Sequence, residues 1–325
     1  MDLNVYYEAV SAIIGLAVGS FLNVVVLRAF TGESIVFPPS KCPSCKNKLK
    51  WYHNIPVLSF IALKGKCAFC KAEISRQYPL VELTTGLIFA LTFFVFGLSL
   101  NTLFMWVIFS ILIVLTVTDL KEKIIFTEHT YALAVVGVIY NLFLSGQYGW
   151  NFGWICIMLL NSLGGIALGF IFMELIARVS KLISKQRAFG EGDSYILGAI
   201  GAVLGYKGIL PVFILAVAAQ AIVSLPVLLR QYFKDKNYAQ FWAFIVFIIL
   251  AGSYYEWQNQ LMYYPVYYFS ILIILTALAI YLCVGLIRSI RKGTSLTFIP
   301  FGPALALAAF VFVIITAKLP VWNIF

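Results

Sequence analysis

The chain has 325 residues, of which 62% are hydrophobic and only 11% are charged. A soluble domain is about half apolar and about a quarter charged, so this composition excludes an ordinary soluble protein and predicts an all-α polytopic membrane protein. The formal net charge is +10, but the basic residues form no single patch. They fall in loops between apolar runs, so we expect no nucleic-acid partner.

Apolar runs near the ~20 residues that a bilayer crossing needs fill most of the chain and predict about eight to ten transmembrane helices. The candidate spans are 9–27, 79–98, 102–118, 130–145, 153–177, 193–206, 209–229, 239–257, 266–287 and 298–317. The predicted segments are a first transmembrane helix at 1–28, a loop domain at 29–78, a transmembrane core at 79–229, an additional transmembrane hairpin region at 230–297 and a terminal helix at 298–325.

The distribution of Lys and Arg predicts the orientation of these spans. If the N-terminus lies outside, all of the 23 basic residues except Lys207 and Lys318 fall in inner loops. This asymmetry is what the positive-inside rule describes. It places the polar loop 29–78 on the cytoplasmic side, where its basic residues would attract anionic membrane lipid.

Four cysteines in the polar loop form two C-x-x-C pairs, Cys42 with Cys45 and Cys67 with Cys70. This spacing is typical of a tetrahedral zinc site, and four thiolates leave no open position, so we predict a structural Zn²⁺ in a small zinc-ribbon-like domain. The loop has little core of its own, and a metal would cross-link it. Two disulfides are the alternative, which a reducing cytoplasm disfavours.

Two acids lie where a predicted span meets water. Asp119 closes the apolar run 103–118, and Asp193 opens the run 194–204. Charge beside hydrocarbon is costly, so these positions indicate a function. Two carboxylates at the same depth on adjacent spans can share a proton and activate a water, as in an aspartyl protease.

The surroundings of the acids support this interpretation and leave one alternative open. Gly190 and Gly192 flank Glu191 and leave the backbone free to bend beside Asp193. Asp193 could instead cap a helix N-terminus, whereas Asp119 ends a helix, where an acid opposes the dipole. Glu82, just after the cysteine loop, is expected to hydrogen-bond a basic loop residue or to assist a site.

Several stretches together resemble the bacterial type IV prepilin peptidase family. They are 19–24 with Arg28, 39–45, 51–59, 74–83, 190–193 and 299–303. The resemblance implies a multi-pass inner-membrane aspartyl protease that removes the basic leader of type IV prepilins or type II secretion pseudopilins on the cytoplasmic face. By position, Asp119 and Asp193 would be its catalytic acids. Many family members also N-methylate the new N-terminus with S-adenosylmethionine, and this cofactor is expected from the resemblance alone.

The sequence departs from the family pattern at three places. Ile125-Phe126-Thr127 follows the first acid where the family usually has Ile-Pro-Asp, and Tyr195 stands where a Lys is usual. Residues 230–290 match no motif of the family. Two other functions stay open: an ion-coupled transporter that uses the intramembrane acids, and a membrane scaffold that docks a partner through the zinc loop. The sequence indicates no oligomeric state.

Overall fold

The computed structural model describes residues 3–317 except for 38, 148, 186, 188, 235, 237, 262–266, 268–269, 272, 279–280 and 283–299. Within these residues the chain is helical and has no strand, with two isolated bridges, Lys41–Lys48 and Lys66–Glu73. This confirms the predicted all-α fold.

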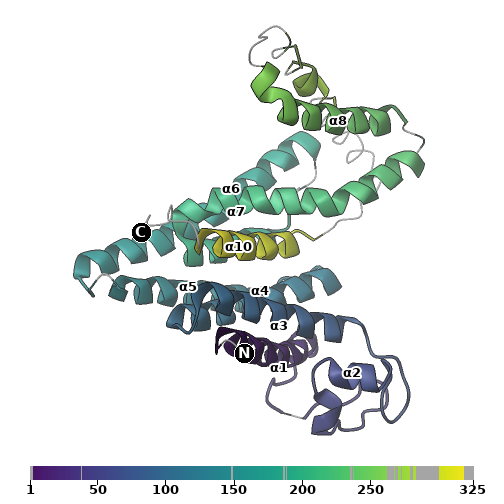
Figure 1. Cartoon of the computed structure of the whole chain (residues 1–325), viewed down its shortest axis with the longest axis vertical. Coiled ribbons are helices and arrows are strands. Elements are labelled where there is room, and N and C mark those ends of the chain that lie inside the picture. Colours follow the sequence, from purple (N-terminus) through teal and green to yellow (C-terminus); the bar gives the residue numbers. More distant parts are fainter. Residues whose placement is uncertain are drawn as a thin grey trace. The chain divides into compact units, whose positions relative to one another are not determined.

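Long helices make up most of the described chain (Figure 1). They are α1 (Leu3–Thr31), α3 (Gln77–Phe96), α4 (Leu100–Glu122), α5 (Thr127–Gln147), α6 (Phe152–Ser184), α7 (Glu191–Lys234), α8 (Tyr238–Leu261) and α10 (Gly302–Ala317), with short η1 (Trp51–Asn54) and α2 (Leu58–Ala62) in the polar loop. Among the described residues, six helices, α1 and α3 to α7, are long and apolar enough to cross a membrane. Two shorter apolar helices are Tyr238–Leu250, within α8, and α10. The predicted span 266–287 lies largely outside the described residues.

The chain forms two compact units. The first contains Met1–Glu174, Gly190–Val217 and Pro300–Phe325, and the second contains Leu175–Phe189 and Ala218–Ile299. The first unit therefore holds both predicted catalytic acids and all four loop cysteines. In the second unit, the aromatic rings of Phe233, Tyr238, Phe241 and Trp242 contact one another around the start of α8.

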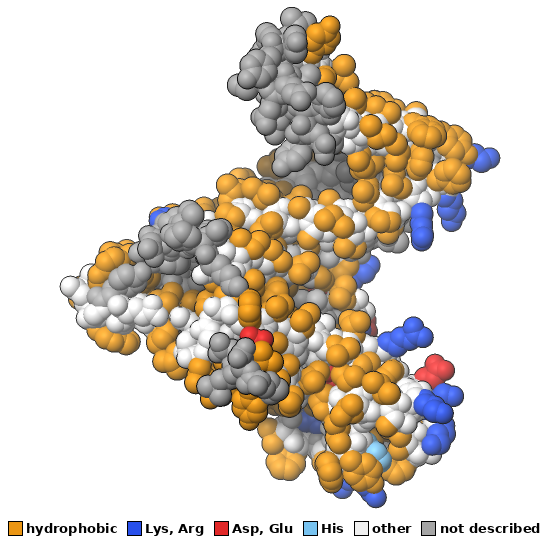
Figure 2. Space-filling model, viewed as in Figure 1, with side chains coloured by type: hydrophobic (Ala, Val, Ile, Leu, Met, Phe, Trp, Pro, Cys, Tyr) orange, Lys and Arg blue, Asp and Glu red, His pale blue; other side chains and the backbone are white. Residues whose placement is uncertain are grey.

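Side chains on the surface agree with a membrane environment. Figure 2 shows hydrophobic side chains over most of the visible surface of the helices, while Lys and Arg gather over the polar loop that carries α2. Leu160 and Ile171 on α6, for example, are 69% and 62% exposed. A soluble monomer rarely exposes large contiguous apolar patches, whereas lipid tails accept them.

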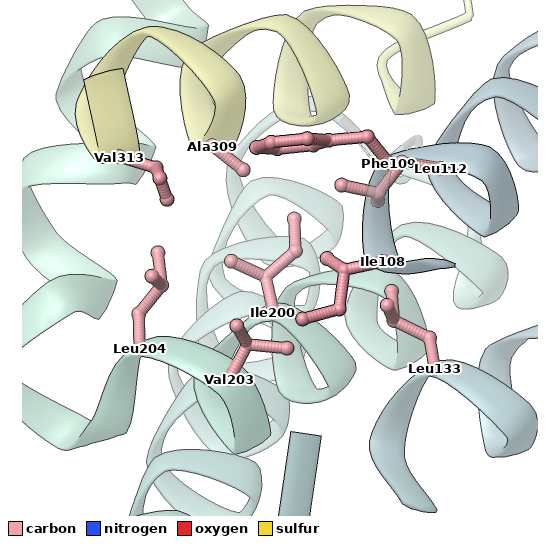
Figure 3. A pocket seen from close by; sticks show the side chains of 9 residues that line it. All are labelled: Ile108, Phe109, Leu112, Leu133, Ile200, Val203, Leu204, Ala309 and Val313. Carbon is pink, nitrogen blue, oxygen red and sulfur yellow. The ribbon is translucent and has the colours of Figure 1, made fainter. Parts of the chain in front are cut away.

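The core of the first unit has two parts. In one, α1 packs along α3 because Gly15 and Gly19 bring the two backbones together: a Cβ on Gly15 would lie 2.7 Å from the Thr85 carbonyl oxygen. In the other, α4, α5, α7 and α10 meet around a small cavity lined only by apolar side chains (Figure 3). This second core joins the two helices that carry the acids.

Helix α7 is not continuous, because Gly205 has non-helical φ/ψ angles of 71° and 177°. The chain turns back there: the ring of Tyr195 contacts Phe170, and that of Phe213 contacts Phe172, only two residues further along α6. In an uninterrupted helix Tyr195 and Phe213 would be separated by about 27 Å. Gly205 therefore divides α7 into a short stretch with Asp193 and a longer one, in agreement with the predicted spans 193–206 and 209–229.

Side chains from α5 and α6 satisfy the carbonyl groups that this break leaves without helical partners. Asn141 Nδ2 donates to the carbonyl oxygens of Ala202 (2.8 Å) and Val203 (3.1 Å), and Ser162 Oγ donates to Ala202 (2.7 Å). Such groups are expensive to leave unpaired in a bilayer. The short stretch of α7 is thus held at its C-terminal end by two neighbouring helices.

Candidate active site and metal site

Asp119 lies in the last turn of α4 with its side chain turned inward. It is 4% exposed, and its Oδ2 accepts a hydrogen bond from the Gly302 N–H, at the start of α10, at 3.1 Å. The helix ends just after it, because Lys123 adopts a left-handed conformation (φ 56°) and donates its N–H to the Asp119 carbonyl. The expected position of this acid at a helix C-terminal end is what the structure shows.

Asp193 lies in the first turn of α7 and is 3% exposed. Its Oδ2 accepts the N–H of Gly190, the residue before the helix, at 2.9 Å. An acid at the third helical position that bonds back to the cap residue is one half of a capping box, so the capping alternative is realised in part. A cap needs no burial, however, and the near-complete burial of this carboxylate points to a further role.

The structure brings the two acids to one place although they are 74 positions apart in the sequence. The carboxylate of Asp119 is close enough to act electrostatically on Asp193. Gly302 joins their surroundings: a Cβ placed there would lie 2.5 Å from Asp119 Oδ2 and 3.3 Å from Cδ1 of Ile196, one turn after Asp193. The ends of α4, α7 and α10 therefore enclose one buried acidic region.

Gly192 has a steric reason to be glycine. The sequence indicated only that it leaves the backbone free to bend. A Cβ at this position would lie 2.6 Å from Ile125 Cδ1, in the loop between α4 and α5. At Gly190 the nearest atom would be 3.5 Å away, an ordinary contact. The first residue of the unusual Ile125-Phe126-Thr127 stretch thus packs directly on the glycine beside Asp193. Tyr195, the other departure, packs against the rings of Phe170 and Tyr131.

The four cysteines of the loop come together as one group. The Sγ atoms of Cys42, Cys45, Cys67 and Cys70 all lie within 4.8 Å of one another, and those of Cys42 and Cys70 are 3.9 Å apart. Sulfurs bound at 2.3 Å to one tetrahedral ion would be about 3.8 Å apart, whereas a disulfide needs about 2.05 Å. All four are free thiols. The cluster could hold a metal ion, and the disulfide alternative does not fit it.

The two C-x-x-C pairs are built in the same way. Cys42 N–H bonds to the Asn47 carbonyl and Cys67 N–H to the Ala72 carbonyl, each closing a tight turn. Lys46 (φ 58°) and Lys71 (φ 60°), each four residues after the first cysteine of its pair, are left-handed. The repeated sequence pattern therefore corresponds to a repeated backbone conformation. Each turn directs its two sulfurs toward the same point.

Backbone groups already favour a thiolate at one position of this cluster. The N–H groups of Cys70 and Phe69 point at the sulfur of Cys67 and lower the pKa of its thiol to about 6. At Cys45 the Asn47 N–H also lowers the pKa, but loss of hydration and the neighbouring thiols of Cys42 and Cys70 outweigh it and raise that pKa to about 11. A bound cation would relieve this crowding of sulfur charge, because metals bind the deprotonated thiolate.

Glu82 anchors the loop to the membrane helices, in a way that the sequence did not predict. Its Oε2 accepts the backbone N–H of Val57 at 2.7 Å, not a basic side chain. Val57 has φ 60° and ψ −48°, a positive-φ conformation that a β-branched residue rarely adopts, so the contact holds a strained turn. Asn23 of α1 donates to the Tyr78 carbonyl at 3.1 Å next to it.

Fold and site together define a class: a polytopic helical membrane protein with a buried pair of aspartates and a four-cysteine loop. Residues 13–96 match the family model of the bacterial peptidase A24 N-terminal domain, and residues 106–225 match that of the type IV leader peptidase family. The first match contains the cysteines and the second contains Asp119 and Asp193. Gly302 and residues 230–290 lie beyond both.

Curated relatives agree with these family matches. The prepilin leader peptidase/N-methyltransferase of Myxococcus xanthus (strain DK1622) is 36% identical over 217 residues, 67% of this chain and 62% of the relative. Proteins of that name from Neisseria gonorrhoeae and Klebsiella pneumoniae are 32% and 33% identical, with matches covering 65% and 62% of this chain and 79% and 87% of theirs. The chain therefore belongs to the type IV leader peptidase family. This membership supports an aspartic peptidase and does not favour a transporter or a scaffold. No solved structure matches the chain.

Proposed function

We propose that this chain is a prepilin leader peptidase that cleaves the basic leader from type IV prepilins or type II secretion pseudopilins. The observation that supports the proposal is that two buried carboxylates, Asp119 and Asp193, lie at the ends of two helices, close enough to interact electrostatically, in a chain of this family. Buried acids in a membrane protein are uncommon and functional. The relatives that carry the name prepilin leader peptidase supply the substrate class.

The chemistry follows from two carboxyl groups that share one proton. The ionised carboxylate takes a proton from a water, whose oxygen attacks the carbonyl carbon of the scissile peptide bond. The protonated carboxyl group donates a hydrogen bond to the carbonyl oxygen. When the C–N bond breaks, the leaving nitrogen takes up the proton that the base removed from water. The products are a leader with a new carboxylate and a pilin with a free amino terminus.

The membrane arrangement is part of the proposal. The N-terminus lies outside, and the cysteine loop, Asp119 and Asp193 lie at the inner face of the cytoplasmic membrane. The asymmetric distribution of Lys and Arg supports this orientation. We retain the segments 1–28, 29–78, 79–229, 230–297 and 298–325 as the proposed organisation, with anionic lipid around the basic inner loops.

The four cysteines would hold a structural Zn²⁺. The gathering of their four sulfurs within 4.8 Å of one another supports it, and a full set of thiolates leaves no position for a substrate. The ion would cross-link the loop.

The names of the relatives support a second activity, N-methylation of the new pilin N-terminus, for which S-adenosylmethionine would supply the methyl group. The described geometry assigns no residues to this donor.

Co-expression with a prepilin tests the peptidase. Asp119→Ala and Asp193→Ala should each abolish leader removal, seen as a mobility shift of the pilin, while both variants stay in the membrane at wild-type amounts. Full leader removal by either variant would refute the two-aspartate mechanism. Cation flux into vesicles that disappears in both variants, with leader removal intact, would instead favour a transporter.

A further inference from the structure

We propose that Gly302, at the start of α10, is a positioning residue for Asp119 and that α10 is part of the catalytic site. The inference rests on the proposed peptidase function and extends it to a helix that lies outside both family matches. It starts from one contact: the Gly302 N–H donates to Asp119 Oδ2 at 3.1 Å in a buried environment, across 183 positions of sequence. The acceptor of this hydrogen bond is the predicted catalytic carboxyl group itself.

The hydrogen bond is charge-assisted when Asp119 is ionised, and such bonds are short and comparatively strong. The start of a helix also favours negative charge, because its first N–H groups have no partners within the helix. Pro303, the next residue, has no N–H at all. The Gly302 amide is the donor at the start of α10 that reaches the acid, and it directs one oxygen of the carboxylate toward α10.

The absence of a side chain at Gly302 is as important as its amide. A Cβ at this position would lie 2.5 Å from Asp119 Oδ2 and 3.3 Å from Asp119 Cγ. Real Cβ atoms essentially never approach an oxygen so closely, so the carboxylate would have to leave its position. Alanine at this position would keep the amide but displace the carboxylate. Gly302 thus sets the position of Asp119 in two ways: its amide donates a hydrogen bond to the carboxylate, and its lack of a side chain leaves space for that carboxylate.

Other contacts fix α10 itself at this place. The ring of Phe310 packs edge-to-face on Phe109 of α4, with centroids 5.0 Å apart, and Ala309 and Val313 line the apolar core beside α4 and α7 (Figure 3). Phe301, just before the helix, is 5% exposed and contacts the ring of Phe213. Because α10 is locked against both acid-bearing helices, its first amide is a rigid reference point for the carboxylate.

The test is Gly302→Ala, with cleavage of a synthetic prepilin peptide by the purified full-length chain. A misplacement of about 1 Å at a reacting group can cost about 100-fold in rate, so we expect kcat to fall by about that factor. The peptide binds through other contacts, so KM should stay within about twofold. Gly164→Ala is the matched control, because a Cβ at Gly164 meets nothing within 4 Å and should leave kcat unchanged.

Two rescue variants separate displacement of the carboxylate from simple crowding or backbone strain. Ile196→Val removes the Cδ1 atom that a Cβ on Gly302 would also approach, and Pro303→Ala removes the restriction that a proline places on the residue before it. Neither change frees Asp119 Oδ2, so neither should restore kcat in Gly302→Ala. Restoration by either one would overturn the proposal, as would wild-type kcat in Gly302→Ala.

The same assay keeps this proposal apart from the proposed function. If Asp119→Ala is inactive and Gly302→Ala is fully active, the peptidase stands and the role of Gly302 is refuted. If Asp119→Ala is fully active, the peptidase mechanism itself fails. Thermal unfolding in detergent accompanies each variant. If Gly302→Ala unfolds at the wild-type temperature with low kcat, the positioning role is supported; if its kcat returns to wild type at temperatures where it is folded, the role is refuted.

Discussion

The break in α7 makes Asn141 the residue whose loss should most clearly destabilise the short stretch of α7 that carries Asp193. Its side chain is fully buried on α5, and its amide nitrogen donates to the carbonyl oxygens of Ala202, Val203 and Gly137. Asn141→Leu keeps a similar volume and removes all three donations. The Gly137 carbonyl lies one turn earlier on the same helix and keeps its helical partner. The carbonyls of Ala202 and Val203 lie just before the break at Gly205, and the break removes their helical partners.

The expected magnitude follows from these two carbonyls. A buried acceptor left without a partner costs about 1–3 kcal/mol in a protein interior. Side-chain hydrogen bonds between membrane helices average only about 0.6 kcal/mol, with a maximum near 1.7. Ala202 still receives the Ser162 hydroxyl at 2.7 Å, so one carbonyl loses its only side-chain donor and the other keeps one. We therefore expect Asn141→Leu to lower the free energy of unfolding by about 1–2 kcal/mol.

Unfolding in mixed detergent micelles, followed by circular dichroism, measures this change. The double variant with Ser162→Ala should lose more than the sum of the single variants, because only the double variant leaves the Ala202 carbonyl with no donor. Ser110→Ala is the control: its hydroxyl bonds to the Trp106 carbonyl of its own helix at 2.7 Å, and its loss orphans no acceptor. Wild-type stability in Asn141→Leu, or strict additivity in the double variant, would refute this account of the break.

Two further predictions concern the cysteine loop. Cys42→Ser, or chelation of the wild-type chain, should remove one bound zinc per chain and make residues 29–78 sensitive to protease while the helices stay in the membrane; a zinc-free loop that resists protease as the wild type does would contradict a structural metal. Glu82→Leu should free the strained Val57 turn and raise proteolysis near residue 57 with zinc content unchanged, because the metal ligands are separate from this anchor. The exposed Lys41–Glu33 pair supplies its control, since Glu33→Leu should change neither readout. Equal proteolysis in Glu82→Leu and wild type would show that Glu82 does not anchor the loop.

Local features of the sequence determined the class, pointed to the four-cysteine cluster and singled out the two buried acids. The length of an apolar run alone indicates a membrane helix. A bilayer core has a set thickness, and backbone groups inside it must form hydrogen bonds within the protein. The geometry of each C-x-x-C pair can be predicted from sequence, because each pair forms one tight turn that brings its two sulfurs together without distant contacts. Asp119 and Asp193 were visible because an acid at the edge of an apolar run is costly whatever surrounds it.

Only the tertiary structure decided what these groups touch. Glu82 and Val57 are 25 positions apart, and no pattern pairs a carboxylate with one particular backbone amide in a loop. The close packing of Ile125 on Gly192, and the bond between Gly302 and Asp119, likewise come from helix ends that packing brings together. Composition and periodicity show how each segment meets lipid or water. They do not show which distant backbone group lies a few ångströms from a given carboxylate, and at this site those distances set the chemistry.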